Sequence, residues 1–155
     1  MTRSEIITQL KQFFKVDNLV CNHTFASFGE RSWQFLSTPY LHCLLVIRRD
    51  ILQTPMFCNN YNVPGGPFRQ RGLRCNLCDL VKSKSDAGKL YLSAHVMGSA
   101  GDFDSKGLAA VQARHKIEDN AAMLPYPIRL ESNVTWLHFD TYDSDNGQKV
   151  TYFNA

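Results

Sequence analysis

The chain has 155 residues, of which 44% are hydrophobic and 12% aromatic, and this composition supports a folded core rather than a disordered tail. Its 17 Lys and Arg against 14 Asp and Glu leave a net charge of +3, which is too mild to indicate nucleic-acid binding by itself. A length of 155 residues suits one domain. The longest apolar run, Cys43 to Ile47, is far shorter than the roughly 20 residues that span a bilayer, so we expect no membrane insertion.

Residues 1–17 predict an amphipathic helix whose apolar side chains recur at helical spacing: Ile6, Ile7, Leu10, Phe13 and Phe14. This segment has neither the apolar stretch nor the small-residue cleavage site of a secretory signal. We therefore expect the chain to be made in a cytoplasm, either that of a bacterium or that of an infected host. The five cysteines agree with this expectation, because an odd number without a secretory signal does not suggest a disulfide framework.

The next elements follow from local signals in the sequence. An irregular stretch runs to about residue 31, and Thr38 and Pro39 then predict the start of a largely buried helix, which Thr54-Pro55 ends. Further along we expect a strand at 56–58, a loop at 59–74, a helix at about 76–84, a strand at 90–94 and a helix at about 107–122 capped by Ser105.

The last 30 residues predict β structure. Residues 128–139 form a strand-like region, Asp143 to Gly147 carries a turn signal, and Val150 to Phe153 returns as a final strand. Helices come first and strands cluster late, an order typical of an α+β fold. We expect helices packed on one antiparallel sheet, with a metal cleft.

Two stretches carry candidate metal ligands. His95 and Asp102 lie in a run whose small residues allow a tight turn, and His138 lies downstream. Imidazole nitrogen and carboxylate oxygen are both zinc ligands, and three protein ligands with an open fourth position are the pattern of a catalytic site. The water in that position has its pKa lowered to about 7. Two isolated histidines are, however, more often ordinary surface or core residues.

Two patterns resemble the signature of the zinc D-Ala-D-Ala carboxypeptidase family, which includes L-Ala-D-Glu phage endolysins and murein endopeptidases. They are S-x-H-x-x-G-x-A-x-D at 93–102 and W-x-H at 136–138. A segment ending in Arg74 is similar to the family's S-G-x-R, although Arg71 replaces the Ser. The resemblance covers roughly residues 38–142. It implies a single peptidase domain, with an N-terminal helix and irregular segment at 1–37 before a catalytic core at 38–155, and the hedgehog/DD-peptidase fold.

The resemblance also implies one zinc ion per chain, held by His95, Asp102 and His138, and hydrolysis of a peptide bond in bacterial peptidoglycan. The general base is open, because Thr135 stands where several relatives carry Glu or Asp. Glu131 is the preferred base. Asp140 is the alternative, although it also suits a role in which it accepts a hydrogen bond from a ligating histidine.

Two further residues are expected to contact the stem peptide of the substrate. Arg74 offers a guanidinium that suits bidentate carboxylate recognition, and Ser93 belongs to the first motif. Arg71 and Arg129 are weaker candidates for the same role. A phage-type lysis enzyme made in the cytoplasm and acting at the wall after release fits these features. The sequence does not identify the bond that is cut or the oligomeric state.

Two competing hypotheses remain. With Thr135 at a frequent base position, the site could hold zinc without hydrolysing anything, which would make the chain a peptidoglycan-binding module of the same fold. A nucleic-acid-binding protein is less supported, because the basic residues lack interleaved stacking aromatics. Those residues are Arg48, Arg49, Arg69, Arg71, Arg74 and Lys82.

The pair Cys75 and Cys78 is a single C-x-x-C, which is half of a structural zinc site or a redox pair. No second pair exists in the chain. Cys21, His23 and Cys58 could complete a site only if the tertiary structure happened to bring them to the pair. Two partly buried thiols are therefore the simpler interpretation.

Overall fold

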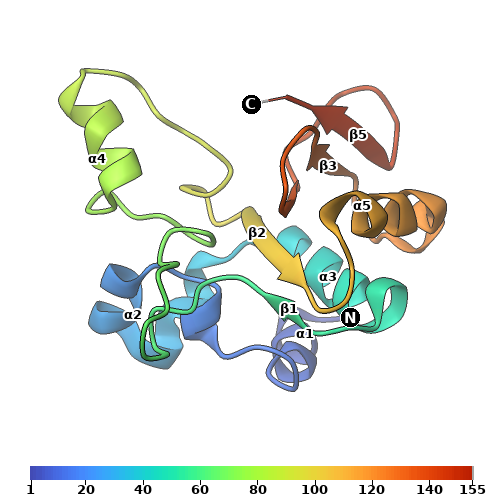
Figure 1. Cartoon of the computed structure of the whole chain (residues 1–155), viewed down its shortest axis with the longest axis horizontal. Helices are drawn as coiled ribbons and strands as arrows, with labels where there is room; N and C mark the ends of the chain where they lie inside the picture. The colour runs from blue at the N-terminus through green and yellow to red at the C-terminus, as the bar shows by residue number, and fades with distance from the viewer. Residues whose placement is uncertain (155) are drawn as a thin grey trace.

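A computed structural model describes residues 1–154, and it has the α+β class that the sequence predicts (Figure 1). The α-helices are α1 (Arg3–Leu10), α2 (Asn22–Phe28), α3 (Thr38–Val46), α4 (Asp79–Asp86) and α5 (Ala110–Asp119). Shorter helical turns are η1 (Val16–Asn18), η2 (Gly29–Phe35), η3 (Ile47–Leu52) and η4 (Ala121–Met123). The strands are β1 (Met56–Phe57), β2 (Ala100–Ser105), β3 (Ile128–Glu131), β4 (Leu137–Asp140) and β5 (Val150–Phe153). Among the described residues, no helix has the length and apolar character needed to cross a membrane.

The first helix is shorter than predicted. It begins with a capping box, in which the Thr2 hydroxyl accepts the N–H of Glu5 and the Glu5 carboxylate accepts the N–H of Thr2. It ends at Leu10 rather than near residue 17, and successive tight turns follow. Phe14 still reaches the core, because its N–H donates to the Leu10 carbonyl and the chain turns inward there. The stretch predicted as irregular up to residue 31 contains η1, α2 and the start of η2.

The predicted buried helix at 38–52 is present as α3, which continues into the π-helical turn η3. Its cap differs from the prediction by one residue, since the Ser37 side chain, not Thr38, accepts the N–H of Tyr40. Pro39 lies in the first turn, as expected. Six of the nine α3 residues are buried, so this helix is the centre of the core rather than a surface helix.

The sheet is mixed, not antiparallel as predicted. Its strand order is β1-β2-β4-β3-β5, and only the β3–β5 pair is parallel. The turn after β4 does reverse the chain, but β2 and β3 already flank β4 on both sides. The returning strand β5 therefore pairs with the outer edge of β3, which runs in the same direction.

Three further predictions need correction. Residues 90–94, predicted as a strand, are an irregular connection that enters a turn at Ala94 and has no ladder partner among the described residues. Strand β2 at 100–105 was missed. Helices α4 and α5 start three residues later than expected, and Ala109 rather than Ser105 occupies the cap position of α5, where its N–H donates to the Gln112 side chain.

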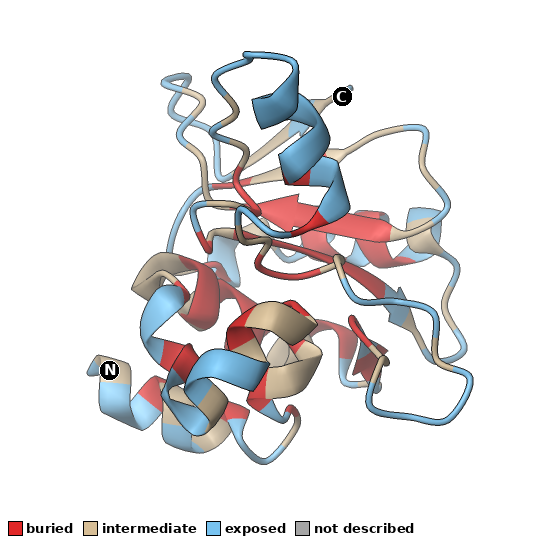
Figure 2. Ribbon diagram, turned by 90° about the vertical axis from the view of Figure 1, so that its left-hand side faces the viewer, coloured by how far each residue is buried: buried red, intermediate tan, exposed pale blue. Residues whose placement is uncertain are grey.

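The core lies between α3, α5 and one face of the sheet. Phe103 of β2 and Phe139 of β4 stack at 5.7 Å, and Tyr40 of α3 stacks on Phe139 at 5.2 Å. The same core includes Ile6 and Leu10 of α1, so the first 37 residues pack with the remainder of the chain. Figure 2 shows the buried residues gathered in the sheet and in the helices beside it.

Residues 58–99, which we call the 58–99 segment, leave the core between β1 and β2. Their only regular element is α4, and Val81 is the only buried residue of that helix. In Figure 1 this helix stands apart from the other helices, and in Figure 2 most of its surface is exposed. The segment returns to the sheet at β2 and carries the first of the two sequence motifs.

Candidate metal centre and pocket

Strand register brings together residues that are far apart in the sequence. Asp102 of β2 lies directly opposite His138 of β4, and Arg129 of β3 lies opposite Asp140 of β4. Continuing the β3–β4 register by one step places Glu131 opposite His138. Because side chains alternate along a strand, all five residues lie on the sheet face that points away from Phe139 and the core.

His95 approaches this face from the 58–99 segment. Gly98 has a φ of +65° in the turn after it, and the Gly98 carbonyl accepts the N–H of Ser37. The Nδ1 atom of His95 lies 2.8 Å from the carbonyl oxygen of Gly72. Since a carbonyl oxygen only accepts, Nδ1 carries the proton, and Nε2 presents its lone pair to Asp102 Oδ1 at 3.4 Å.

His138 is oriented in the same manner from the other side. Its Nε2 atom lies 3.1 Å from the Asp140 carboxylate, which favours a proton on Nε2. Its Nδ1 atom then faces Asp102 Oδ1 at 2.7 Å. Donor atoms of His95, Asp102 and His138 all lie within 4.8 Å of one another, so three electron-pair donors converge and a cation, either a proton or a metal ion, suits the space between them.

The electrostatics of the three residues follow from burial and from these contacts. Burial opposes ionisation of Asp102, but the interactions with His138 and His95 outweigh it and lower the pKa of the carboxyl. Burial also lowers the pKa of His95. In His138 burial acts in the same direction, but hydrogen bonds to Asp102 and Asp140 outweigh it and raise the pKa to about 9. The site therefore keeps its carboxylate ionised and attracts positive charge.

Asp140 is fully engaged by its neighbours. Both of its oxygens accept hydrogen bonds from the Arg129 guanidinium at 2.9 Å, and the N–H of Tyr142 donates to Oδ1 at 3.0 Å. The residue is 1% exposed. Burial raises its pKa, but the bonds from His138 and Arg129 outweigh this effect and lower it. Asp140 is thus a charged anchor for the His138 ring.

Glu131 is placed differently. Its Oε2 atom is 4.0 Å from His138 Nδ1, the atom that faces Asp102. Within residues 1–154 its carboxylate has no hydrogen-bond partner, and it lines a pocket of about 320 Å³ together with His95, Asp102 and His138. Thr135 is exposed and lines a different, smaller cavity beside α5, so it does not reach this pocket.

The two predicted substrate residues also line the pocket. Arg74 is already used in part, since it pairs with Asp102 Oδ2 at 3.3 Å and donates to the Gln70 carbonyl at 2.6 Å. The Ser93 hydroxyl accepts the N–H of Val96 at 3.4 Å, a contact that stabilises the turn carrying His95.

Sequence reasoning missed several residues that shape the pocket. Arg129 ranked as a weak substrate candidate, yet it pairs with Asp140; only the β3–β4 register reveals this contact. Trp136 was named as part of the second motif but without a role; its indole N–H is buried near the pocket without a partner among the described residues. The aromatic residues Tyr91, Tyr142 and Phe153 also line the pocket. Arg71, the other weak candidate, pairs instead with Asp104.

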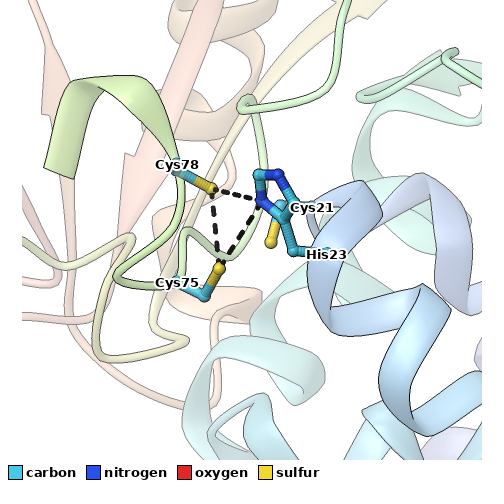
Figure 3. Close-up of side chains that lie close together, drawn as sticks. All are labelled: Cys21, His23, Cys75 and Cys78. Atoms are coloured by element: carbon cyan, nitrogen blue, oxygen red, sulfur yellow. Dashed lines mark hydrogen bonds between the residues drawn. The ribbon is translucent and has the colours of Figure 1, made fainter. Parts of the chain in front are cut away.

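The structure also brings together a second group of donors that the sequence did not link. Cys21, His23, Cys75 and Cys78 each offer an atom within 4.8 Å of the others (Figure 3). Cys58, the other cysteine considered as a partner, is buried elsewhere and does not belong to this group. The only sequence signal was the C-x-x-C itself, because the other two residues lie more than 50 positions upstream.

Comparisons with known proteins give no independent assignment: no family model, no curated protein and no solved structure matches this chain.

Proposed function

We propose that the chain is a zinc-dependent peptidase that hydrolyses a peptide bond in bacterial peptidoglycan, in a fold of the hedgehog/DD-peptidase type. The observation that carries the proposal is the convergence of His95 Nε2, Asp102 Oδ1 and His138 Nδ1 in a pocket that also holds the Glu131 carboxylate. The motif resemblance supports the substrate class, and the donor set of two imidazoles and one carboxylate supports zinc.

The donor set fits zinc for three reasons. The donor atoms come from three ligands rather than four, which leaves a position for water, as catalytic zinc sites require. The far nitrogen of each histidine ring is held by an acceptor, Gly72 for His95 and Asp140 for His138, as in most zinc-histidine sites. When bound, zinc supplies Lewis acidity and lowers the pKa of water toward neutrality.

The chain's own residues then have separate tasks. Glu131 accepts the proton of the attacking water and delivers it to the leaving amine. Asp140 holds the His138 ring in one tautomer, and Arg129 keeps Asp140 ionised. Arg74 offers guanidinium N–H donors to a carboxylate or a developing oxyanion of the stem peptide.

A non-hydrolytic binding module of the same fold is the second candidate, and the position of Thr135 favours it. This residue occupies a frequent base position of the family and faces away from the pocket. The two candidates differ only in whether Glu131 takes over as the base. The nucleic-acid alternative loses support, because four of its six basic residues are paired with acids: Arg49–Asp50, Arg71–Asp104, Arg74–Asp102 and Lys82–Asp86.

The test combines metal analysis with wall digestion. We expect His138→Ala to lose one equivalent of zinc and to release no new amino termini from purified sacculi, whereas the exposed control His115→Ala keeps both properties. Mass spectrometry of the fragments identifies the bond that is cut. Zinc and sacculus binding without release support the binding module, and equal zinc contents in the wild-type and His138→Ala proteins contradict both candidates.

A further inference from the structure

The second donor group is assembled by a close approach of two chain segments. The N–H of Leu73 donates to the Leu19 carbonyl and the N–H of Cys21 donates to the Leu73 carbonyl, both at 2.9 Å. Gly72 permits the approach, since a Cβ atom there would lie 2.1 Å from the Leu19 oxygen. The start of α2 and the residues before α4 are therefore held side by side, with Cys21 near Cys75.

The distances within the group match the edges of a tetrahedron. Cys75 Sγ and Cys78 Sγ are 4.0 Å apart, and His23 Nδ1 is 3.7 Å from the first and 3.8 Å from the second (Figure 3). Zinc bonds of about 2.3 Å to sulfur and 2.0–2.1 Å to nitrogen give tetrahedral edges of about 3.8 Å between sulfurs and about 3.5 Å between sulfur and nitrogen. Cys21 Sγ lies within 4.8 Å of the other donors, as a fourth corner requires.

Two of the sulfur atoms have polar neighbours. The Cys21 sulfur lies 3.1 Å from the Thr24 hydroxyl, and the N–H of Leu77 points at the Cys75 sulfur at 3.4 Å. Donors of this kind stabilise sulfur ligands from outside the coordination sphere. Cys21 and Cys78 are fully buried, and around them only a small apolar cluster with Val81 is present, separate from the main core.

We propose that Cys21, His23, Cys75 and Cys78 form a second, structural zinc site. Three thiolates and one imidazole are soft donors that select zinc over magnesium or calcium. Four protein ligands close the coordination sphere, so this site holds structure and does not activate water. None of the four residues lines the pocket of the proposed hydrolase.

A zinc ion at this site would link the 58–99 segment, through Cys75 and Cys78, to the start of α2, through Cys21 and His23. Helix α4 contributes one buried residue to packing, so apolar burial supplies little of the order in this segment. Arg74, next to Cys75, donates its N–H to the carbonyl of His95 at 3.2 Å. A metal at Cys75 therefore also fixes the backbone from which His95 reaches the pocket.

A thiol redox pair is the competing use of Cys75 and Cys78. A disulfide between them would consume two of the three sulfur donors and would leave Cys21 and His23 without a shared partner. The approach of all four donors to one point is unexplained by a redox pair. A Cys75–Cys78 disulfide in protein purified under reducing conditions would favour it.

The decisive experiment uses His138→Ala, which removes the first metal centre without touching the second. We expect this variant, purified with zinc and a reducing agent, to retain one zinc per chain. Its X-ray absorption spectrum should show three sulfur neighbours at about 2.3 Å. Replacement by Co²⁺ should give intense near-ultraviolet sulfur-to-cobalt charge-transfer bands and a tetrahedral visible spectrum.

Variants of the second site complete the test. Cys75→Ser with Cys78→Ser should lose one zinc and the charge-transfer bands, while Cys43→Ala, which removes a buried thiol outside the group, should keep both. A His138→Ala protein with no zinc overturns the second site and leaves the hydrolase proposal standing. A His138→Ala protein whose zinc lacks sulfur neighbours also overturns the second site. If the wild-type and His138→Ala proteins both carry one sulfur-bound zinc, the second site stands and the first metal centre does not.

Discussion

Glu131 and Asp140 are both close to His138, but the fold uses them differently. Asp140 receives hydrogen bonds from a histidine, an arginine and a backbone N–H, so its lone pairs are occupied. Glu131 keeps its carboxylate free inside the pocket. A general base needs a free lone pair within reach of water. A carboxylate that orients a metal-ligating histidine must instead be held in place by its own hydrogen bonds. The geometry therefore supports Glu131 as the base and Asp140 as a positioning residue.

This distinction predicts that two conservative changes affect different properties, turnover in one case and zinc affinity in the other. Glu131→Gln should keep its zinc and reduce peptide release from sacculi about 10²- to 10⁴-fold, the usual effect of losing a general base. Asp140→Asn should weaken zinc binding about 10- to 100-fold, because the His138 ring loses its charged partner. Zinc titration against a competing chelator measures the second effect, and turnover at saturating zinc isolates the first.

Glu118→Gln is a suitable control, since Glu118 carries its charge on α5 away from the pocket and should leave both measurements unchanged. If Asp140→Asn keeps full zinc affinity but loses turnover while Glu131→Gln remains active, the two roles are exchanged. If neither variant loses turnover, the base is another group.

At the scale of single residues the sequence predicted which side chains converge, but not how they are paired. His95, Asp102 and His138 were recognisable from their motifs, and the structure brings them together. The choice between Glu131 and Asp140 depended on strand register, and the partnership of Arg129 with Asp140 did as well. Register across strands that are separated by loops cannot be read from local spacing.

Among the elements, β2 shows most clearly why sequence patterns fail here. Its sequence Ala-Gly-Asp-Phe-Asp-Ser is poor in the β-branched and aromatic residues that favour strands. It is a strand because β1 and β4 flank it on both sides and Phe103 anchors it in the core. Strong local signals, by contrast, located α3 and β5 correctly, since a buried apolar helix and a strand after an Asn-Gly turn are both locally encoded.

The turn between His95 and β2 is the element on which the first motif depends, and Gly98 is its critical residue. A Cβ atom at this position would lie 1.9 Å from the Phe35 carbonyl, and the residue has φ of +65°. We expect Gly98→Ala to destabilise the fold by about 1–2 kcal/mol for the left-handed backbone, with about 1–3 kcal/mol more for over-packing against η2. Zinc content at the first centre should fall with it.

Gly107 provides the matched control, because its φ is +74° and no atom lies within 4 Å of the point that a Cβ atom would occupy. Gly107→Ala should carry only the backbone cost. Urea unfolding of both variants measures the difference between the two. Equal destabilisation would show that the Phe35 contact is relieved by a small movement of the turn.

For the whole molecule, the main contrast is between the part built on the large buried core and the 58–99 segment, which has little core of its own. The helices α1 and α3 and the inner face of the sheet share one cluster of buried residues. The 58–99 segment instead depends on hydrogen bonds, on the small cluster around Val81 and, in our proposal, on a second metal. No periodicity in the sequence predicted this contrast. The proposed metal site depends on Cys21 and His23, which only the tertiary structure brings close to Cys75 and Cys78.

Limited digestion with trypsin should reveal the contrast directly. Lys84 and Lys89 are exposed, so trypsin should cut after them with or without metal. Arg74 is half-buried and immediately precedes Cys75, so cleavage after Arg74 should depend on the metal. In His138→Ala, which keeps only the second site, a chelator should raise cleavage after Arg74 by about 100-fold, the factor by which metal at 100 times its dissociation constant suppresses local opening. Fragment masses identify the bond, and zinc added back should restore protection. Cleavage after Arg74 that ignores the chelator would mean that packing alone holds the segment in place.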